Sequence, residues 1–156
     1  MMEEALVRNS EPVEQLRVIS QNVQRNSVHV EIMLNTCIHD YDIIFIQEPP
    51  IRELRKAPSS SDKEGEAVIG APIHPDWLYM ARPINSSDRM PRVMAYVNKR
   101  LKHMRPSLRL DLVNHLDIQV LSLFNEEREY CLLNVYNADT QHAGHDYFKI
   151  IFCEKL

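Results

Sequence analysis

The stretch of residues 42–50, Asp-Ile-Ile-Phe-Ile-Gln-Glu-Pro-Pro, constrains the fold of this chain more than any other. Its apolar run, residues 43–46, is rich in β-branched and aromatic side chains, which is typical of a strand buried on both faces. Gln47 and Glu48 follow the run, and the two prolines after them cannot continue a β-ladder. In open α/β sheets, ligands bind beyond the carboxyl ends of the strands. Glu48 is therefore either a solvated acid at a strand end or a ligand-binding carboxylate.

The segment before this strand favours the second interpretation. Residues 16–22 alternate as a strand would, and this strand ends at Asn22. Asn26 or Ser27 can then cap a helix, and the apolar residues that follow have helical spacing: Val30, Met33, Leu34, Cys37 and Ile38. A strand, a helix and a strand of these lengths form a βαβ unit with parallel strands. Parallel strands place their carboxyl ends on the same side, so we expect Asn22 and Glu48 to face one crevice.

The rest of the chain predicts more strands and one more helix. Residues 52–66 are polar and rich in serine, which indicates an inserted loop. Trp77 is expected in the core or at its edge, and a helix is expected to begin at Asp146. The strands between them are predicted to be short: residues 77–80, 92–98, 116–124 and 130–136, the last two as an antiparallel pair.

Composition places the chain among ordinary globular proteins. Of its 156 residues, 44% are hydrophobic and 26% charged, which excludes wholesale disorder. We expect a polar arm at residues 1–14 and one domain at residues 15–156. The net charge of −4 argues against a protein that coats nucleic acid by bulk charge. The three cysteines match neither a zinc site nor a disulfide framework, and no signal peptide or membrane span is evident, so we expect an intracellular protein without membrane contact.

One segment is nevertheless basic. Residues 89–109 carry seven Lys and Arg side chains and no acid. This segment is either a solvated surface or a contact surface for a nucleic-acid backbone. In the second case the chain would be a non-catalytic module that binds nucleic acid or a protein partner, through residues such as Arg92, Lys99, Arg100 and Lys102.

Four segments together resemble one known superfamily: Ser-Gln-Asn-Val at residues 20–23, Asp-Ile-Ile-Phe-Ile-Gln-Glu-Pro at 42–49, Arg-Val-Met-Ala-Tyr-Val at 92–97 and Leu-Asn-Val-Tyr-Asn at 133–137. The chain is similar to the endonuclease/exonuclease/phosphatase superfamily, the DNase I-like fold. Within it, the chain looks most like the apurinic-type endonuclease domain of non-LTR retrotransposons. The resemblance covers nearly all of this chain but only the first part of the family's domain.

The resemblance implies an α/β fold: part of a four-layer α/β sandwich, whose mixed sheet starts with a βαβ unit and whose second sheet is largely missing. It also implies phosphodiester hydrolysis with Mg²⁺ as the cofactor. Asn22 matches the amide that orients the ion and the phosphate, Glu48 the metal-binding carboxylate, and Tyr136 the tyrosine beside the scissile phosphate. Mg²⁺ prefers carboxylate and phosphate oxygens, and an amide or a phenol can donate hydrogen bonds to a phosphate. From the residues alone, Asn22 could equally be a turn residue and Tyr136 a tyrosine at the core edge.

The chain also departs from the family's pattern. Gln24 stands where some relatives have an acid, and Asp139 where an asparagine is common. The family's later Gly-Asp-x-Asn and Ser-Asp-His motifs, which act on the phosphate and the attacking water, do not occur. We therefore expect the amino-terminal fragment of a retroelement-derived, DNA-nicking domain that is inactive alone and leaves an apolar sheet face uncovered. Its partners would be DNA and the remainder of a longer polyprotein, and its location would be nuclear.

Overall fold

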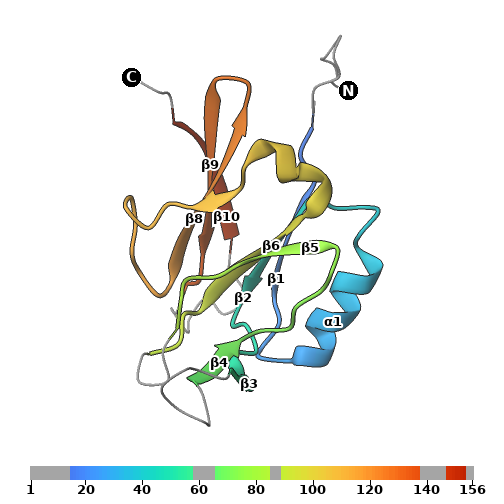
Figure 1. Ribbon diagram of the computed structural model, residues 1–156. Helices are drawn as coiled ribbons and strands as arrows, with labels where there is room; N and C mark the ends of the chain where they lie inside the picture. The colour runs from blue at the N-terminus through green and yellow to red at the C-terminus, as the bar shows by residue number, and fades with distance from the viewer. Residues whose placement is uncertain (1–14, 58–65, 85–88, 138–146, 154–156) are drawn as a thin grey trace.

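The computed structural model describes residues 15–57, 66–84, 89–137 and 147–153, which contain two four-stranded β-sheets and a separate hairpin (Figure 1). The first sheet has the strand order β1 (Val18–Asn22), β2 (Ile43–Gln47), β6 (Val93–Asn98) and β5 (Trp77–Met80). Strands β1 and β2 are parallel, whereas β6 is antiparallel to both of its neighbours. The predicted mixed sheet that starts with parallel strands is therefore confirmed. The polar arm at residues 1–14 lies outside the described residues.

The second sheet is antiparallel throughout. Its strand order is β10 (Tyr147–Cys153), β9 (Arg128–Val135), β8 (Ile118–Asn125) and β7 (Ser107–Leu108). Strands β8 and β9 are the antiparallel pair that the sequence predicts. A 3₁₀-helix, η1 (Lys99–Met104), follows β6 directly. No helix in the described part of the chain is long and apolar enough to cross a membrane.

Helix α1 (Ser27–Thr36) covers one face of the first sheet (Figure 1). Asn26 caps it, since its side-chain oxygen accepts a hydrogen bond from the His29 amide. Trp77 lies in the core, as predicted, and its indole donates a 2.8 Å hydrogen bond to the backbone oxygen of Leu34. The predicted apolar stripe packs on the sheet, its first three residues buried and its last two partly buried: Val30, Met33, Leu34, Cys37 and Ile38.

The second sheet covers the other face of the first, so that α1 and the two sheets form three layers (Figure 1). The expectations that the second sheet is largely missing and that an apolar face is left uncovered are therefore wrong. Strands β8 and β9 supply enough apolar side chains to bury that face, and burial of apolar area is the main favourable term in folding. The buried residues between the sheets come from both sides: Ile43, Phe45, Ala95 and Val97 from the first sheet, and Leu121, Leu123 and Leu132 from the second.

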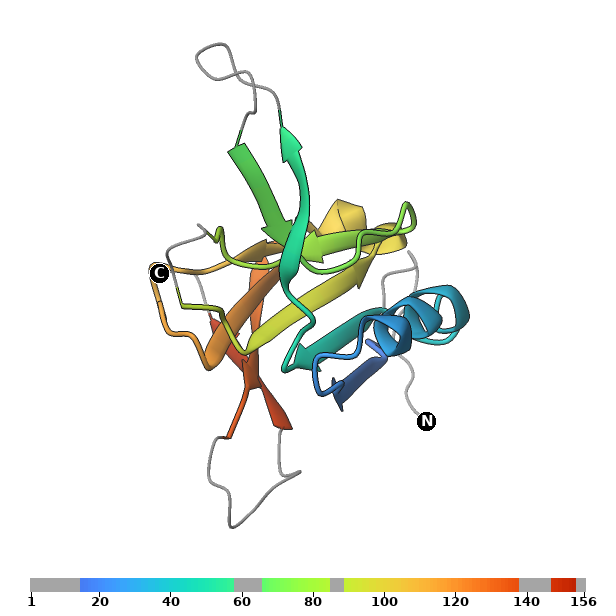
Figure 2. The same ribbon diagram turned by 90° about the horizontal axis from the view of Figure 1, so that it is seen from below.

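Two further expectations are wrong. In place of the loop expected at residues 52–66, β3 (Arg52–Ala57) pairs with β4 (Glu66–Gly70) as an antiparallel hairpin that projects from the rest of the molecule (Figure 2). A projecting hairpin has little need of the apolar alternation by which strands are recognised. Instead of a helix from Asp146, residues 147–153 form β10, paired with β9 over its full length. Backbone pairing at an open sheet edge here outweighs local preference.

Glu129 on β9 is a buried acid that links the folded state to pH. Its carboxylate accepts hydrogen bonds of 2.5 Å from the Ser122 hydroxyl and from the Arg109 guanidinium. The Ser122 hydrogen bond, reinforced by Arg109, holds the pKa of Glu129 below its ordinary value of 4.5. A pKa lowered by folding stabilises the fold above the unfolded-state pKa, and this stabilisation is lost as the pH falls through the folded-state pKa.

We therefore expect the melting temperature of the wild type to fall more steeply below about pH 4.5 than that of Glu129→Gln. At neutral pH the variant should be the less stable of the two, because it loses a charge-assisted contact. Thermal melts across this pH range provide the measurement. The control is Glu126→Gln, which changes an exposed acid in the β8–β9 turn and should follow the wild type. Parallel melting curves for the wild type and Glu129→Gln would count against this role for Glu129.

Candidate functional site

The carboxyl ends of β1 and β2 lie together at one end of the first sheet, as the sequence predicts. We call this end of the sheet, where the two strands stop, the edge. Asn22 lies opposite Gln47 in the parallel register. Beyond them, the Val23 amide donates to the Gln47 oxygen (3.0 Å), and the Arg25 amide donates to the Glu48 oxygen (2.8 Å). The backbone therefore continues to pair past the ends of both strands. This pairing fixes the two strand tips, and Asn22 and Glu48 with them, at the same edge.

Glu48 and Tyr136 meet at this edge. The Tyr136 hydroxyl donates a 2.8 Å hydrogen bond to Glu48 Oε2, although the two residues are 88 positions apart. Glu48 follows β2 of the first sheet, and Tyr136 follows β9 of the second. Two of the three side chains expected at the site are thus in direct contact across the two sheets.

Arg92 and Asp117 complete this group. The Arg92 guanidinium binds Asp117 through two hydrogen bonds, Nε to Oδ1 at 2.6 Å and Nη2 to Oδ2 at 2.9 Å. It also lies over the Tyr136 ring, 5.1 Å from the ring centroid. The hydrogen bond to Asp117 raises the pKa of Arg92, and the negative charge of Glu48 adds to the shift. Backbone hydrogen bonds join the same residues. The Glu48 amide donates to the Arg92 backbone oxygen (3.0 Å), and the Tyr136 amide donates to the Asp117 backbone oxygen (2.8 Å).

Asn22 makes a local contact of the turn type. Its Oδ1 accepts a 3.0 Å hydrogen bond from the Gln24 amide, which is the contact expected of an asparagine that ends a strand. Its side chain lies on the face that the second sheet covers, because residues opposite each other in register share a face and Gln47 reaches Asn134 of β9. Asn22 therefore shares the edge with Glu48 and Tyr136, with its amide oxygen engaged in the turn.

Unusual backbone geometry gathers at the same edge. Gln24, Arg25 and Glu48 have φ angles of 52°, 61° and 53°, in the left-handed region that non-glycine residues seldom adopt. They are three of the five such residues in the described part of the chain. Conformations of this kind cost about 1–3 kcal/mol each and cluster at ligand sites. The clustering is an independent reason to regard this edge as functional.

A pocket of about 450 Å³ opens beside Glu48, and we call it the edge pocket. Within the described part of the chain, its charged lining consists of Glu48 and three arginines, Arg25, Arg89 and Arg92. Arg25 and Arg89 form no ion pair with any described carboxylate. The local balance of charge is positive although the chain as a whole is acidic. Such a pocket attracts an anion, and its one carboxylate offers oxygen atoms to a cation.

A buried amide pair lies directly below the edge. Gln47 Nε2 donates to Asn134 Oδ1 (2.7 Å) and to Ser20 Oγ (2.9 Å). Asn134 Nδ2 in turn donates to the Met94 oxygen (2.9 Å). Gln47 immediately precedes Glu48, and Asn134 lies two positions before Tyr136. This pair joins the two sheets one or two residues away from the side chains that meet at the edge.

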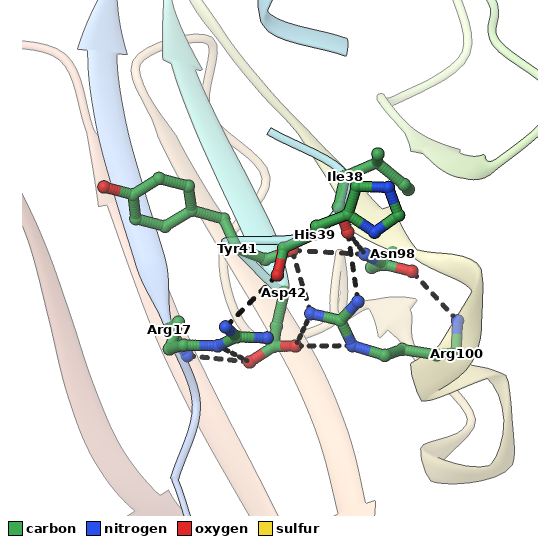
Figure 3. A network of polar contacts seen from close by, with 7 residues as sticks. All are labelled: Arg17, Ile38, His39, Tyr41, Asp42, Asn98 and Arg100. Atoms are coloured by element: carbon green, nitrogen blue, oxygen red, sulfur yellow. Dashed lines mark hydrogen bonds and ion pairs between the residues drawn. The ribbon is translucent and has the colours of Figure 1, made fainter. Parts of the chain in front are cut away.

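The basic segment at residues 89–109 is divided between the two ends of β6. Arg92 precedes the strand and lies at the edge, whereas Lys99, Arg100 and Lys102 belong to η1 beyond its other end. Lys99 and Lys102 are exposed. The Arg100 guanidinium binds the buried Asp42 carboxylate and the backbone oxygens of Ile38 and Tyr41 (Figure 3). Arg100 thus holds the fold together at the end opposite the edge.

Sequence reasoning missed Asp117, Arg25 and the Gln47–Asn134 pair. Asp117 pairs with Arg92 across 25 positions, and no local pattern connects them. Arg25 reaches the edge because of its left-handed backbone, which the sequence does not display. Gln47 did leave a signal, since a polar side chain at the end of a fully buried strand needs a buried partner. Asp139 lies outside the described residues.

The resemblance implies an Mg²⁺ ion, and the side chains at this edge can hold such an ion only if it keeps other ligands. The described part of the chain contains no group of three or more His, Cys, Asp or Glu side chains that could hold an ion. Glu48 offers a single carboxylate. Mg²⁺ often binds through one or two carboxylates and keeps several waters, some of which substrate phosphates replace. The edge therefore fits a hydrated ion that is bound together with a phosphate, and not an ion enclosed by protein ligands.

Comparison with protein-family models, with curated proteins and with solved structures finds no match for this chain. The site is therefore defined by its own geometry: a carboxylate, a phenol and an arginine in contact at the joint edge of two sheets, beside a positively charged pocket.

Proposed function

We propose that the chain is the amino-terminal part of an Mg²⁺-dependent endonuclease domain of the kind found in retroelements, and that its edge binds a nucleic-acid phosphate. The observation that carries this proposal is the 2.8 Å hydrogen bond between Tyr136 and Glu48. The two residues come from separate motifs of the resemblance, and each is assigned there to the metal and phosphate site. Their contact across the two sheets is what such a site requires.

The side chains of the edge have distinct roles in this proposal. Glu48 would hold the hydrated ion, which when bound neutralises phosphate charge. Tyr136 holds the Glu48 carboxylate in place through its hydroxyl. Arg92 is fixed by Asp117 and presents a permanent positive charge next to the tyrosine. Arg25 and Arg89, from the lining of the edge pocket, attract the nucleic-acid backbone.

These 156 residues alone are expected to bind without cleaving. Phosphodiester hydrolysis needs a group that activates the attacking water, and phosphate-holding groups on the far side of the reacting phosphorus. The Gly-Asp-x-Asn and Ser-Asp-His motifs that supply these groups in the family do not occur in the sequence. Purified chain incubated with supercoiled plasmid and Mg²⁺ should therefore leave the plasmid intact. Nicking that Glu48→Ala abolishes would confirm the site and overturn the expected inactivity.

The binding experiment is fluorescence anisotropy with a labelled single-stranded DNA oligonucleotide, in Mg²⁺ and in EDTA. We expect Mg²⁺ to tighten binding by the wild type, and Glu48→Gln to lose this enhancement, a change of about tenfold in Kd if one charge-assisted contact is removed. Glu48→Gln keeps the size of the side chain and an oxygen that Tyr136 can bind, so the fold should be preserved. Binding that ignores both Mg²⁺ and this substitution would refute the proposed site.

A paired variant separates this proposal from binding by the basic segment. Lys99→Ala/Lys102→Ala removes two exposed charges at the opposite end of β6. If the edge is the binding site, this variant should retain the Mg²⁺-dependent part of binding. If the variant loses binding and Glu48→Gln does not, the chain is instead a module that binds nucleic acid through η1.

A further inference from the structure

A second pocket adjoins the edge pocket and has no role in the proposed function. It measures about 580 Å³, and we call it the arginine pocket. It shares Arg89, Pro91 and Arg92 with the edge pocket, so the two pockets lie side by side along the segment that leads into β6. The arginine pocket adds Arg82 and His115 to this shared wall.

The described lining of the arginine pocket carries more positive than negative charge, with three arginines and one acid. Among the residues that the structure describes, Asp117 is the one acid of its lining, and the two hydrogen bonds from Arg92 already occupy that carboxylate. Arg82 and Arg89 form no ion pair with any carboxylate in the part of the chain that the structure describes. Two guanidinium groups therefore remain for an anion. Guanidinium groups match the geometry of a phosphate and bind it through two parallel hydrogen bonds.

His115 supplies a further donor. Its Nδ1 accepts a 2.9 Å hydrogen bond from the Asp117 amide. A neutral imidazole that accepts at Nδ1 carries its proton at Nε2. The ring of His115, which lines the pocket, therefore has its Nε2–H to donate. Asn114, also in the lining, adds an amide that can both donate and accept.

The remaining lining is apolar, formed by Pro83, Ile84, Pro91 and Leu116. An inorganic anion would gain nothing from these apolar side chains, and the pocket volume of about 580 Å³ is far larger than the volume of one phosphate. It lies within the range of roughly 300–1,000 Å³ for pockets that hold small organic ligands. An unstacked base can pack against apolar side chains and guanidinium planes, and amide and imidazole groups can hydrogen-bond its edge.

We propose that the arginine pocket binds one nucleotide of a nucleic-acid strand, its phosphate held by Arg82 and Arg89 and its base packed against the apolar wall. The assignment rests on the proposed function, because Arg89 and Arg92 would then serve two successive phosphates of the same strand. It also specifies the substrate class. A base can enter such a pocket only from a strand that is single or locally opened, so the chain prefers single-stranded over fully paired nucleic acid.

The test is an NMR and calorimetric titration of the whole chain in EDTA with a nucleoside monophosphate, and in parallel with inorganic phosphate and with the free nucleoside. The nucleotide should bind more tightly than either part alone and should shift amide signals near Arg82, Arg89 and His115. Arg82→Ala and Arg89→Ala should each weaken nucleotide binding about tenfold. Arg128→Ala removes an exposed charge at the far end of β9 and should have no effect.

The outcomes separate this inference from the proposed function. If the nucleotide binds no better than phosphate, or Arg128→Ala weakens it as much as Arg82→Ala does, the arginine pocket is not a nucleotide site, even where Mg²⁺-dependent oligonucleotide binding at Glu48 persists. If Arg82→Ala weakens the mononucleotide but not a single-stranded oligonucleotide, the pocket does not serve a strand and the inference fails. Nucleotide binding that depends on Arg82, together with oligonucleotide binding that ignores Glu48, would instead defeat the proposed function alone.

Discussion

Replacing Asp42 with alanine is expected to lower the free energy of unfolding by about 3 kcal/mol, because it removes the buried partner of an ion pair and leaves its hydrogen-bond donors unmatched. The Asp42 side chain is 5% exposed. Its oxygens accept hydrogen bonds from the Arg17 amide (2.8 Å) and from Arg100 at Nη2 (2.7 Å) and Nε (3.0 Å) (Figure 3). Arg100 is 40% exposed and can regain water, so the loss should lie near the lower end of the range for such pairs.

Thermal and urea unfolding measure this effect, and a loss of this size should lower Tm by about 10 °C. Asp40→Ala is the matched control, since Asp40 is an exposed acid two positions away, and it should change Tm little. Equal stability of Asp42→Ala and Asp40→Ala would show that the ion pair does not hold the strands together. Because this group lies at the end of the first sheet opposite Glu48, the loss of stability should leave the edge itself intact.

The second large effect concerns the amide pair between the sheets. Asn134→Leu is expected to cost about 2 kcal/mol, because Gln47 Nε2 then keeps only Ser20 as a partner in a fully buried position. Gln47→Leu should cost a similar amount by leaving Asn134 Oδ1 without that donor. The double variant replaces both partners with apolar groups, which is often nearly neutral.

Urea unfolding of the wild type, both single variants and the double variant forms a complete cycle. We expect the double variant to lose less stability than the sum of the single losses, by about 1 kcal/mol or more. Strictly additive losses of stability would mean that the two amides do not stabilise each other. The packing of β2 against β9 next to the edge would then not depend on the Gln47–Asn134 hydrogen bond.

The sequence predicts the first part of this fold well because that part is periodic. The β1–α1–β2 unit follows from alternation, from the apolar stripe of α1 and from the Asn26 cap, and these are local properties of consecutive residues. The convergence of Asn22 and Glu48 at one edge then follows from parallel pairing alone. The same local reasoning fails at β10, where pairing with β9 determines the structure, and at the β3–β4 hairpin, which projects from the rest of the molecule (Figure 2).

The sequence groups Asn22, Glu48 and Tyr136 into one candidate site, but it does not give their contacts. The hydrogen bond between Tyr136 and Glu48 depends on how the two sheets pack, which no segment of the sequence specifies by itself. The same holds for the pairing of Arg92 with Asp117. The sequence suggests one basic surface because the seven cations lie within one segment, residues 89–109. A six-residue strand, β6, separates Arg92 from Lys99 and places them at opposite ends of a sheet.

The most direct test of the proposed edge is an NMR titration with Mn²⁺, a paramagnetic ion that substitutes for Mg²⁺ at oxygen sites. If Glu48 and Tyr136 form an ion and phosphate site, low concentrations of Mn²⁺ should broaden the amide signals of residues near Glu48, Arg92 and Tyr136. The broadening should disappear in Glu48→Gln. Broadening elsewhere in the chain, or broadening at this edge that persists in Glu48→Gln, would contradict the proposal that Glu48 binds the ion.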